Sequence, residues 1–330
     1  MEFKNIVGID VGKESLDFIV LESGEKKTES KVSNTLKKIE KYIQSLNLDL
    51  SQTLFCMEHT GMYCLPLLRA LEKMKAKIWI EGAMQIKKSI GLVRGKSDKI
   101  DAARIASYAY MHQKNVKLWE PERTVIRQLK SLLSQRNRLI KSKKSLEAPL
   151  KEGKNFLSKE DRLTIKKYSI VPVNAIKKNI EAITKQIEEL IKSDDTIGEL
   201  HSYATSVPYI GTIIGATVLV KTNEYKKIND PKKFACHSGI APFEHTSGKS
   251  IRGKTRVSPL ADKTLKTLMH LAAVGAISRT GEFKDYYDRK IAQGKNKMSV
   301  INAIRNKLIL RLFSCVNNKK KYSKNNLVLA

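Results

Sequence analysis

The order of apolar and polar positions divides the chain into stretches of different character. In residues 3–109, short β-rich runs alternate with helical patterns, which is typical of an α/β layer structure. The runs that we interpret as strands are IVGIDVG, LDFIVLES, KKTESKVS, TLFCMEHT and AKIWIEGA. The first two meet at a tight turn that contains Gly12, and helical periodicity separates the later strands. We therefore expect an α/β domain over residues 1–120.

The next stretch, residues 121–200, is dominated by long helical patterns. VIRQLKSLLSQRNRLIKSKKSLEAPL and NAIKKNIEAITKQIEELIKS carry apolar residues three and four positions apart, and a polar stretch from Gly153 to Pro172 separates them. This pattern predicts an antiparallel helical hairpin or coiled-coil arm that joins chains into an oligomer. Two plain helices packed on their own domain remain an alternative, because neither run keeps strict heptads for long.

Pro and Gly punctuate short apolar helices at the start of the third stretch. The run SVPYIGTIIGATVLV resembles a helix-hairpin-helix element, whose backbone amides can contact phosphates, although a tight turn between two packed helices produces the same letters. We expect a mainly α-helical domain over residues 201–322, followed by a frayed tail at residues 323–330.

The net charge of the chain indicates what kind of partner it binds. The 330 residues include 62 Lys and Arg against 33 Asp and Glu, a net charge of +29. Residues 223–322 alone hold 22 basic and 7 acidic residues, a net charge of +15. Basic side chains that neutralise phosphates release counterions, so a polyanion is the expected partner, with the C-terminal part as the main surface. A merely basic protein from a lysine-rich proteome is the alternative.

The cysteines and the apolar runs of the sequence indicate the cellular compartment of the protein. The four cysteines show no CxxC pairing and no matched histidine spacing, so the sequence predicts neither a disulfide framework nor a zinc site. No charged leader precedes a long apolar stretch, and no run approaches the roughly 20 apolar residues that cross a bilayer. We expect a cytoplasmic protein without a membrane partner.

Four acidic residues stand where their carboxylates can converge. Asp10 ends the first predicted strand, and Glu58 ends the buried strand in CMEHTG. Asp98 and Asp101 begin the helix of DAARIASYAYM three positions apart, which puts them on one helix face with Cβ atoms about 5–6 Å apart. Two strand ends and one helix face can thus meet at a single point.

Carboxylates gathered so closely repel one another unless a cation neutralises them, and oxygen ligands favour Mg²⁺ or Mn²⁺. Two such ions about 3.5–4 Å apart would clamp the attacking and leaving oxygens of a phosphoryl displacement. Taken singly, the acids have ordinary explanations as turn formers, helix caps or surface groups. Together they favour the site of a nuclease or transposase, because a basic neighbourhood suits an approaching phosphate backbone. That neighbourhood comprises Lys87, Lys88, Arg94, Lys96, Lys99 and Arg104.

Several motifs carry a family resemblance. VGIDVGKESLDFIVL, MEHTGMY and GLVRGKSDKIDAARIASYA resemble the N-terminal DEDD domain of the Piv/MooV family of insertion-sequence transposases. SVPYIGTIIGATVLV, KFACHSGIAPFEHTSGKSIRGKTRVS and ADKTLKTLMHLAA resemble the second conserved domain of that family. The resemblance implies a ribonuclease H-like (RuvC-like) fold for the N-terminal domain. It also implies DNA recombination by site-specific strand exchange, in an oligomer guided by a structured bridge RNA that pairs with donor and target DNA.

The resemblance also assigns residues. Asp10, Glu58, Asp98 and Asp101 match the metal ligands of the family, and Ser247, which follows the GIAP string, matches its nucleophile. Serine suits recombination because a phosphoserine bond stores the energy for religation without ATP. From the sequence alone, Ser250 or Ser258 would serve as well, and only the resemblance favours Ser247. The basic residues expected to hold nucleic acid are Lys96, Lys99 and Arg104 beside the acids, and Lys249, Arg252, Lys254 and Arg256 beside the serine.

Other functions stay open at this point. A metal-only nuclease such as a Holliday-junction resolvase would use the four acids without a serine, and a nucleic-acid-binding scaffold would bind tightly without cleaving. The hairpin GIDVGKESLDFIVL also resembles the phosphate-binding hairpin of sugar kinases and actin-like ATPases, but the later Gly-rich adenosine loop of those proteins does not appear. The sequence does not decide whether the serine and the acids of one site come from the same chain or from two.

Overall fold

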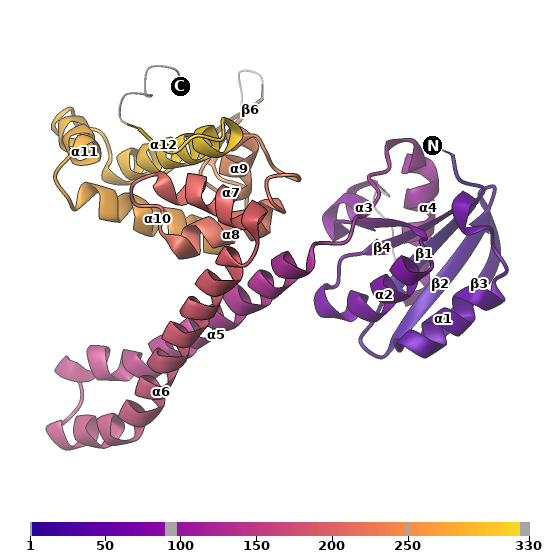
Figure 1. The fold of residues 1–330 in the computed structure, drawn as a ribbon, viewed down its shortest axis with the longest axis horizontal. Coiled ribbons are helices and arrows are strands. Elements are labelled where there is room, and N and C mark those ends of the chain that lie inside the picture. The colour runs from indigo at the N-terminus through magenta and orange to yellow at the C-terminus, as the bar shows by residue number, and fades with distance from the viewer. Residues whose placement is uncertain (1, 90–97, 248–250, 324–330) are drawn as a thin grey trace. The chain divides into compact units, whose positions relative to one another are not determined.

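The chain divides into two compact units, residues 1–121 and 122–330 (Figure 1). The computed structural model describes residues 2–89, 98–247 and 251–323. The first unit corresponds to the expected α/β stretch. The second contains the two long helices together with the helices that follow them, and the finer division near residue 200 stays a prediction.

A five-stranded mixed sheet forms the centre of the first unit. Its order is β3-β2-β1-β4-β5; β2 runs antiparallel to both of its neighbours, and β4 and β5 run parallel to β1. The strands are β1 (Asn5–Val11), β2 (Ser15–Glu22), β3 (Glu25–Ser33), β4 (Thr53–Glu58) and β5 (Lys77–Glu81). All five expected strands are present, and the mixed sheet agrees with the α/β ribonuclease H-like fold that the resemblance implies.

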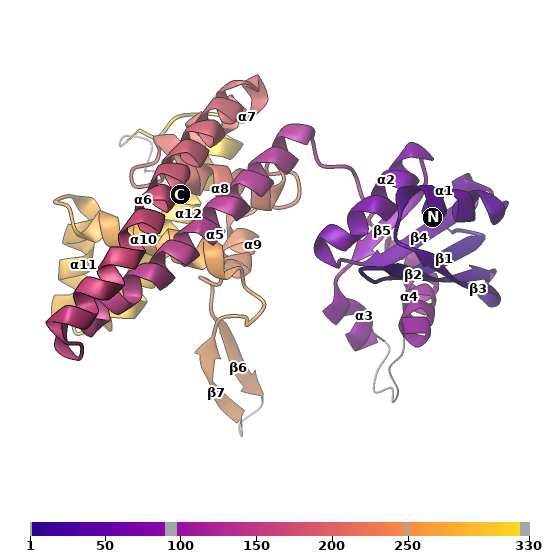
Figure 2. The same cartoon turned by 90° about the horizontal axis from the view of Figure 1, so that it is seen from below.

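Helices cover both faces of this sheet. The helices are α1 (Leu36–Ser45), α2 (Leu65–Lys73), α3 (Ala83–Ser89) and α4 (Asp98–His112), with short 3-10 turns at Leu50–Gln52, Gly61–Cys64 and Gln113–Asn115. Because side chains alternate along a strand, Val7 and Ile9 pack with α1 and α2, whereas Ile6 packs with α4. Figure 2 shows α1 and α2 on one side of the sheet and α4 on the other.

Helix α4 crosses β1 at unusually close range. A Cβ atom added to Gly8 would lie 2.4 Å from the Ala106 nitrogen and 2.6 Å from the Ala102 oxygen, so only glycine fits there. Just beyond the carboxyl end of α4, the Gln113 side chain accepts a 2.7 Å hydrogen bond from the Phe3 nitrogen, which lies just before β1. Helix α4 therefore runs antiparallel to β1, and its first turn lies toward the carboxyl end of that strand.

The second unit is mainly helical. Its helices are α5 (Thr124–Glu152), α6 (Lys159–Lys192), α7 (Asp195–Ser206), α8 (Thr212–Thr222), α9 (Pro231–His237), α10 (Lys263–Ile277), α11 (Glu282–Ala292) and α12 (Lys297–Asn317). One hydrophobic core contains residues of α8, α10 and α12. The start of α5 and the end of α6 also belong to it, and there Ile126, Leu129 and Ile187 are fully buried. Whether the α7–α8 connection acts as a helix-hairpin-helix element stays a prediction.

Helices α5 and α6 lie side by side and extend away from this core (Figure 1). The Arg136 Nε donates a 3.0 Å hydrogen bond to Thr184 Oγ1 across the pair. The polar stretch expected from Gly153 to Pro172 is wrong in extent, because α6 already begins at Lys159. The Ser158 hydroxyl caps this start by accepting from the Asp161 nitrogen, and the helix continues through Pro172. An oligomerisation role for this helical hairpin stays a prediction.

The second unit also contains a β-hairpin that the sequence did not reveal. Strands β6 (Phe243–Ser247) and β7 (Ile251–Arg256) pair antiparallel, and Figure 2 shows them projecting from the helices that carry them. Within the described parts of the chain, no helix is long and apolar enough to cross a membrane.

Candidate active site

Asp10 and Glu58 occupy neighbouring positions at the carboxyl ends of two adjacent parallel strands. Ile9 of β1 is in register with Met57 of β4, so the next residue of each strand is one of the two acids. Both acids are partly exposed, whereas the residues before them are buried. The strand register therefore brings these two predicted site residues together.

The same register extends the acidic positions across the sheet. Asp10 is paired with Asp17 of β2, and Glu58 is paired with Glu81 of β5. All four carboxylates belong to the sheet face that α4 covers, because they alternate with residues of the opposite core. Asp17 and Glu81 were not among the residues predicted from the sequence. The sequence shows how side chains alternate along each strand, but it does not show which strands pair or in which register.

The two outer carboxylates have partners of their own. Asp17 is buried and lies 3.5 Å from Lys31 Nζ. Glu81 accepts hydrogen bonds from the Gly82 nitrogen at 2.8 Å and from the Tyr108 hydroxyl at 3.1 Å. Burial, together with the charge of Glu81, raises the pKa of Tyr108 to about 12, so this phenol stays protonated and donates. Burial likewise raises the pKa of the Cys56 thiol, which keeps it neutral.

Helix α4 supplies the other two predicted acids. Its antiparallel course along β1 directs its first turn, which contains Asp98 and Asp101, toward the carboxyl end of that strand. Asp101 forms a 2.8 Å ion pair with Arg104 on the next turn. The side chains of Asp98 and Lys99 lie outside the described part of the structure, and so does Lys96.

The donor chemistry of this sheet edge fits a hard divalent cation. Asp10 and Glu58 are partly exposed residues that carry carboxylate oxygens at neighbouring strand positions. Among the described side chains, no three His, Cys, Asp or Glu residues are grouped closely enough to hold a metal ion, and this search does not include Asp98. Of the expected metal ligands, Asp10 and Glu58 are thus the pair that the strand register places next to each other.

Ser247 lies in the second unit, at the end of β6, where it pairs with Ile251 of β7. The expected phosphate-binding residues Arg252, Lys254 and Arg256 all belong to β7. The Arg256 side chain is exposed. The side chains of Ser247, Arg252 and Lys254 lie outside the described part of the structure, as does the whole of Lys249.

Comparisons with known proteins match both units. A family model for DEDD transposases of IS110 type, described as "Transposase", matches residues 7–152. A second model, described as "Transposase IS116/IS110/IS902 family", matches residues 201–288. These two matches share a family name and follow one another along the chain.

Individual relatives agree with the family models. The chain is 26% identical to the "Pilin gene-inverting protein" of Moraxella bovis over 97% of its own length and 98% of that protein. It is 25% identical to a 43.6 kDa protein of insertion element IS110 from Streptomyces coelicolor, over 46% of this chain and 36% of that protein.

Among solved structures, the complex of T. thermophilus RuvC with a Holliday junction substrate matches 35% of this chain and 99% of that chain, with a TM-score of 0.30 and 14% identity. The family assignment follows from the two models and the full-length relative. The chain belongs to the IS110/IS116/IS902 family of DEDD transposases, and it is an enzyme of DNA recombination.

Proposed function

We propose that this transposase moves an insertion sequence by site-specific DNA strand exchange, guided by a structured RNA that pairs with donor and target DNA. The observation that carries the proposal is the placement of Asp10 and Glu58 in one register, with the first turn of α4 directed to the same end of β1. Family membership and the pilin gene-inverting relative support DNA exchange as the reaction.

In this proposal the acidic residues of the first unit hold Mg²⁺ or Mn²⁺. The ligands would be Asp10, Glu58, Asp98 and Asp101. When bound, such a cation supplies positive charge at a phosphodiester and thereby favours attack on its phosphorus. The chain's own contribution is the strand register, which fixes the backbone positions of Asp10 and Glu58, so that no loop has to become ordered to bring these two residues together.

Ser247 is the proposed nucleophile. Its hydroxyl oxygen forms a bond to the phosphorus, the bond from phosphorus to one deoxyribose oxygen breaks, and the proton of the serine passes to the released oxygen through solvent or a nearby base. A deoxyribose hydroxyl of the exchanged strand reverses these steps. The number of phosphodiester bonds is conserved, so no ATP is required.

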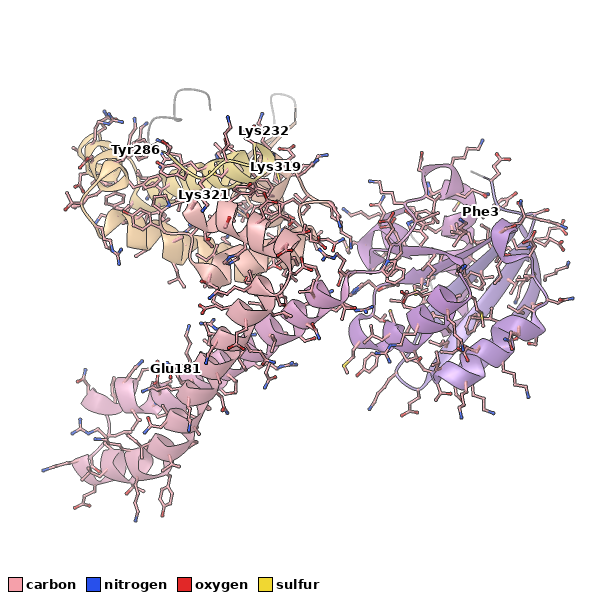
Figure 3. All side chains as sticks on the ribbon, in the orientation of Figure 1. Phe3, Glu181, Lys232, Tyr286, Lys319 and Lys321 are labelled. Atoms are coloured by element: carbon pink, nitrogen blue, oxygen red, sulfur yellow. The ribbon has the colours of Figure 1, made fainter. Side chains whose placement is uncertain are left out.

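Basic residues around both parts hold the nucleic acid in this proposal. They are Lys96, Lys99 and Arg104 in the first unit and Lys249, Arg252, Lys254 and Arg256 in the second. Exposed lysines elsewhere in the second unit extend the positive surface, among them Lys232, Lys319 and Lys321, which Figure 3 labels. Such residues give salt-dependent affinity for DNA and RNA without reading their sequence.

Exposed apolar side chains on the helical hairpin support an oligomer. Phe156 is 87% exposed, and Tyr168 and Val171 of α6 are 73% and 72% exposed. Tyr168 and Val171 are three positions apart and therefore share one face of α6, and exposed apolar groups that form a patch are typical of interaction surfaces. We propose that this end of the hairpin joins copies of the chain into a dimer or tetramer.

The decisive experiment is a cleavage assay with DNA that carries the ends of the element, Mg²⁺ and RNA transcribed from the flanking sequence. We expect a covalent protein–DNA adduct that disappears in Ser247→Ala and in Asp10→Asn. Cleavage that survives Ser247→Ala would instead identify a metal-only nuclease. Binding without any cleavage by the unaltered chain would identify a scaffold.

A mixing experiment addresses the origin of each half of the site. Asp10→Asn and Ser247→Ala chains are each inactive in the proposal. Adduct formation in their mixture, but in neither alone, would require that the acids and the serine come from different chains. No recovery after co-expression would place both in one chain.

A further inference from the structure

A buried arginine without a counter-ion lies between α10 and α12. The side chain of Arg305 belongs to a residue only 5% exposed. Its Nη2 lies 2.5 Å from His270 Nδ1, its Nη1 donates a long 3.4 Å hydrogen bond to Asn302 Oδ1, and its Nε has no hydrogen-bond partner. Within the described residues, no carboxylate pairs with this guanidinium. A buried cation in this state is costly, and an incoming anion would relieve that cost.

His270 presents a hydrogen-bond donor beside Arg305. Because Nδ1 faces a guanidinium that can only donate, the ring accepts there and carries its proton on Nε2. Burial and the charge of Arg305 both lower the pKa of His270, which favours this neutral form. Lys266 stands one turn earlier on α10, so it lies on the same helix face.

These groups lie next to the segment that leads into the serine-bearing hairpin. The Asn302 amide donates a 2.8 Å hydrogen bond to the Ile240 oxygen, while its own oxygen accepts from Arg305. A Cβ atom added to Gly239 would lie 3.5 Å from Lys266 Cδ, and Gly239 has a φ of +66°. The guanidinium, the lysine stem and the start of the GIAP string therefore form one contact network.

We propose that Arg305, His270 and Lys266 form a binding site for a backbone phosphate of the DNA strand that enters at the β6–β7 hairpin. Arg305 supplies an uncompensated positive charge from beneath the site, whereas His270 offers its Nε2–H and Lys266 its ammonium group as direct contacts. Through Asn302, a phosphate bound there would also fix the segment that precedes β6. This inference rests on the proposed function, because it takes DNA as the ligand and Ser247 as the residue to be positioned.

The structure distinguishes this arginine from others on the same helix. Arg311 of α12 forms an ion pair with Glu282 at 2.5 Å and stacks over the Phe283 ring with its guanidinium carbon 4.6 Å from the centroid. Its charge is already compensated, so it gains less from a phosphate. Arg311→Gln is therefore a matched control for Arg305→Gln, since both changes remove one positive charge from α12.

The test measures binding of the full chain to a fluorescent DNA duplex in EDTA, over a series of salt concentrations. For Arg305→Gln we expect affinity to fall about tenfold and the slope of log K against log salt to fall by about one. The melting temperature should be unchanged or higher, because an uncompensated buried charge is removed. For Arg311→Gln we expect the affinity to stay within about threefold of that of the unaltered chain and the slope to stay the same.

His270→Asn provides a second variant that does not depend on a buried side chain. The asparagine oxygen replaces Nδ1 as an acceptor, whereas the donor at Nε2 is lost. We expect a weaker loss of affinity, about threefold, and no further loss when Arg305→Gln is already present. Unchanged affinity and slope in both Arg305→Gln and His270→Asn would overturn the inference. A lowered melting temperature with unchanged DNA binding would do the same, because it would assign Arg305 a structural role.

The proposed function is judged separately in these experiments. The Ser247-dependent adduct reports on catalysis, whereas the salt dependence in EDTA reports on one phosphate contact. An adduct together with unchanged binding of both Arg305→Gln and His270→Asn would overturn only the phosphate site. Absence of DNA binding by the unaltered chain would overturn the proposed function itself.

Discussion

The two units of the chain differ in net charge and in how their charged side chains are placed. The first, residues 1–121, holds 20 Lys and Arg against 15 Asp and Glu, a net charge of +5. The second, residues 122–330, holds 42 against 18, a net charge of +24. The first unit fixes carboxylates by strand register, whereas the second spreads cations over helices and one hairpin. Chemistry at a phosphate depends on exact placement, while attraction to a polyanion depends on the sum of many charges.

The largest effect should come from the sheet-edge carboxylates. Asp10→Asn or Glu58→Gln should reduce adduct formation by at least about 10²–10³-fold, because each removes a proposed ligand at the reacting phosphate. DNA affinity in EDTA should stay the same or rise, since one negative charge is lost. A gel assay for the adduct and fluorescence anisotropy for binding would measure the two effects.

Glu81→Gln is the matched control for that experiment. Glu81 is in register with Glu58 on the same face, but it is held by Tyr108 and the Gly82 nitrogen. We expect at most a several-fold loss of adduct. An equal loss in Glu81→Gln and Glu58→Gln would contradict the special role of the Asp10–Glu58 pair and extend the site across the sheet.

The next effect concerns the packing that aligns α4 with β1. Gly8→Ala would place a Cβ atom within 2.6 Å of the backbone of α4. We expect the free energy of unfolding to fall by about 1–3 kcal/mol, because backbone atoms on both sides must move. Urea denaturation followed by circular dichroism would measure the shift in midpoint.

Gly82→Ala provides a control in the same unit, because an added Cβ atom there meets nothing within 4 Å. Its midpoint should stay close to that of the unaltered chain. Equal midpoints for Gly8→Ala and the unaltered chain would show that α4 can move aside without cost. In that case α4 would not be held rigidly at the carboxyl end of β1.

Much of the first unit could be predicted from the sequence, since period-two alternation and buried apolar runs marked all five strands. The second unit was less predictable. Its β-hairpin contains Lys, Arg, His and Gly in place of an apolar face, so no alternation of apolar side chains announced it. Pro172 suggested a helix boundary, yet α6 continues through it. Helix α6 also stays in contact with α5 through the Arg136–Thr184 hydrogen bond.

The candidate site divides in the same way. Motif positions indicated Asp10 and Glu58, and strand pairing supports their adjacency. Asp17 and Glu81 could not be predicted as members of the same row, because register depends on which strands pair and not on any one strand. Arg305 escaped notice for a related reason. In the sequence it is one basic residue among many, and only its burial beside His270 sets it apart.

A buried carboxylate in the second unit sharpens the contrast with the exposed sheet edge. The Glu224 side chain is 2% exposed and forms a 2.9 Å ion pair with Arg123, which also pairs with Asp194. Arg123→Ala should lower the free energy of unfolding by about 1–2 kcal/mol, because it leaves Glu224 buried with weaker compensation from Lys226.

Thermal unfolding would measure this change, with Glu224→Gln on the Arg123→Ala background as the control. Neutralising the orphaned carboxylate should restore part of the lost stability. If the double variant is less stable than Arg123→Ala, the arginine stabilises the unit by packing and not by compensating Glu224.

The smallest effect on stability is expected at the far end of the helical hairpin. Phe156→Ser should leave the free energy of unfolding within about 0.5 kcal/mol, since the side chain already faces water. Self-association should weaken three- to fivefold, about 1 kcal/mol, if this residue lies in an interface between copies. Leu260→Ser is the control, because Leu260 is 70% exposed in the same unit but outside the hairpin. Sedimentation velocity over a range of concentrations would compare them, and a larger change in Leu260→Ser than in Phe156→Ser would place the interface away from the hairpin.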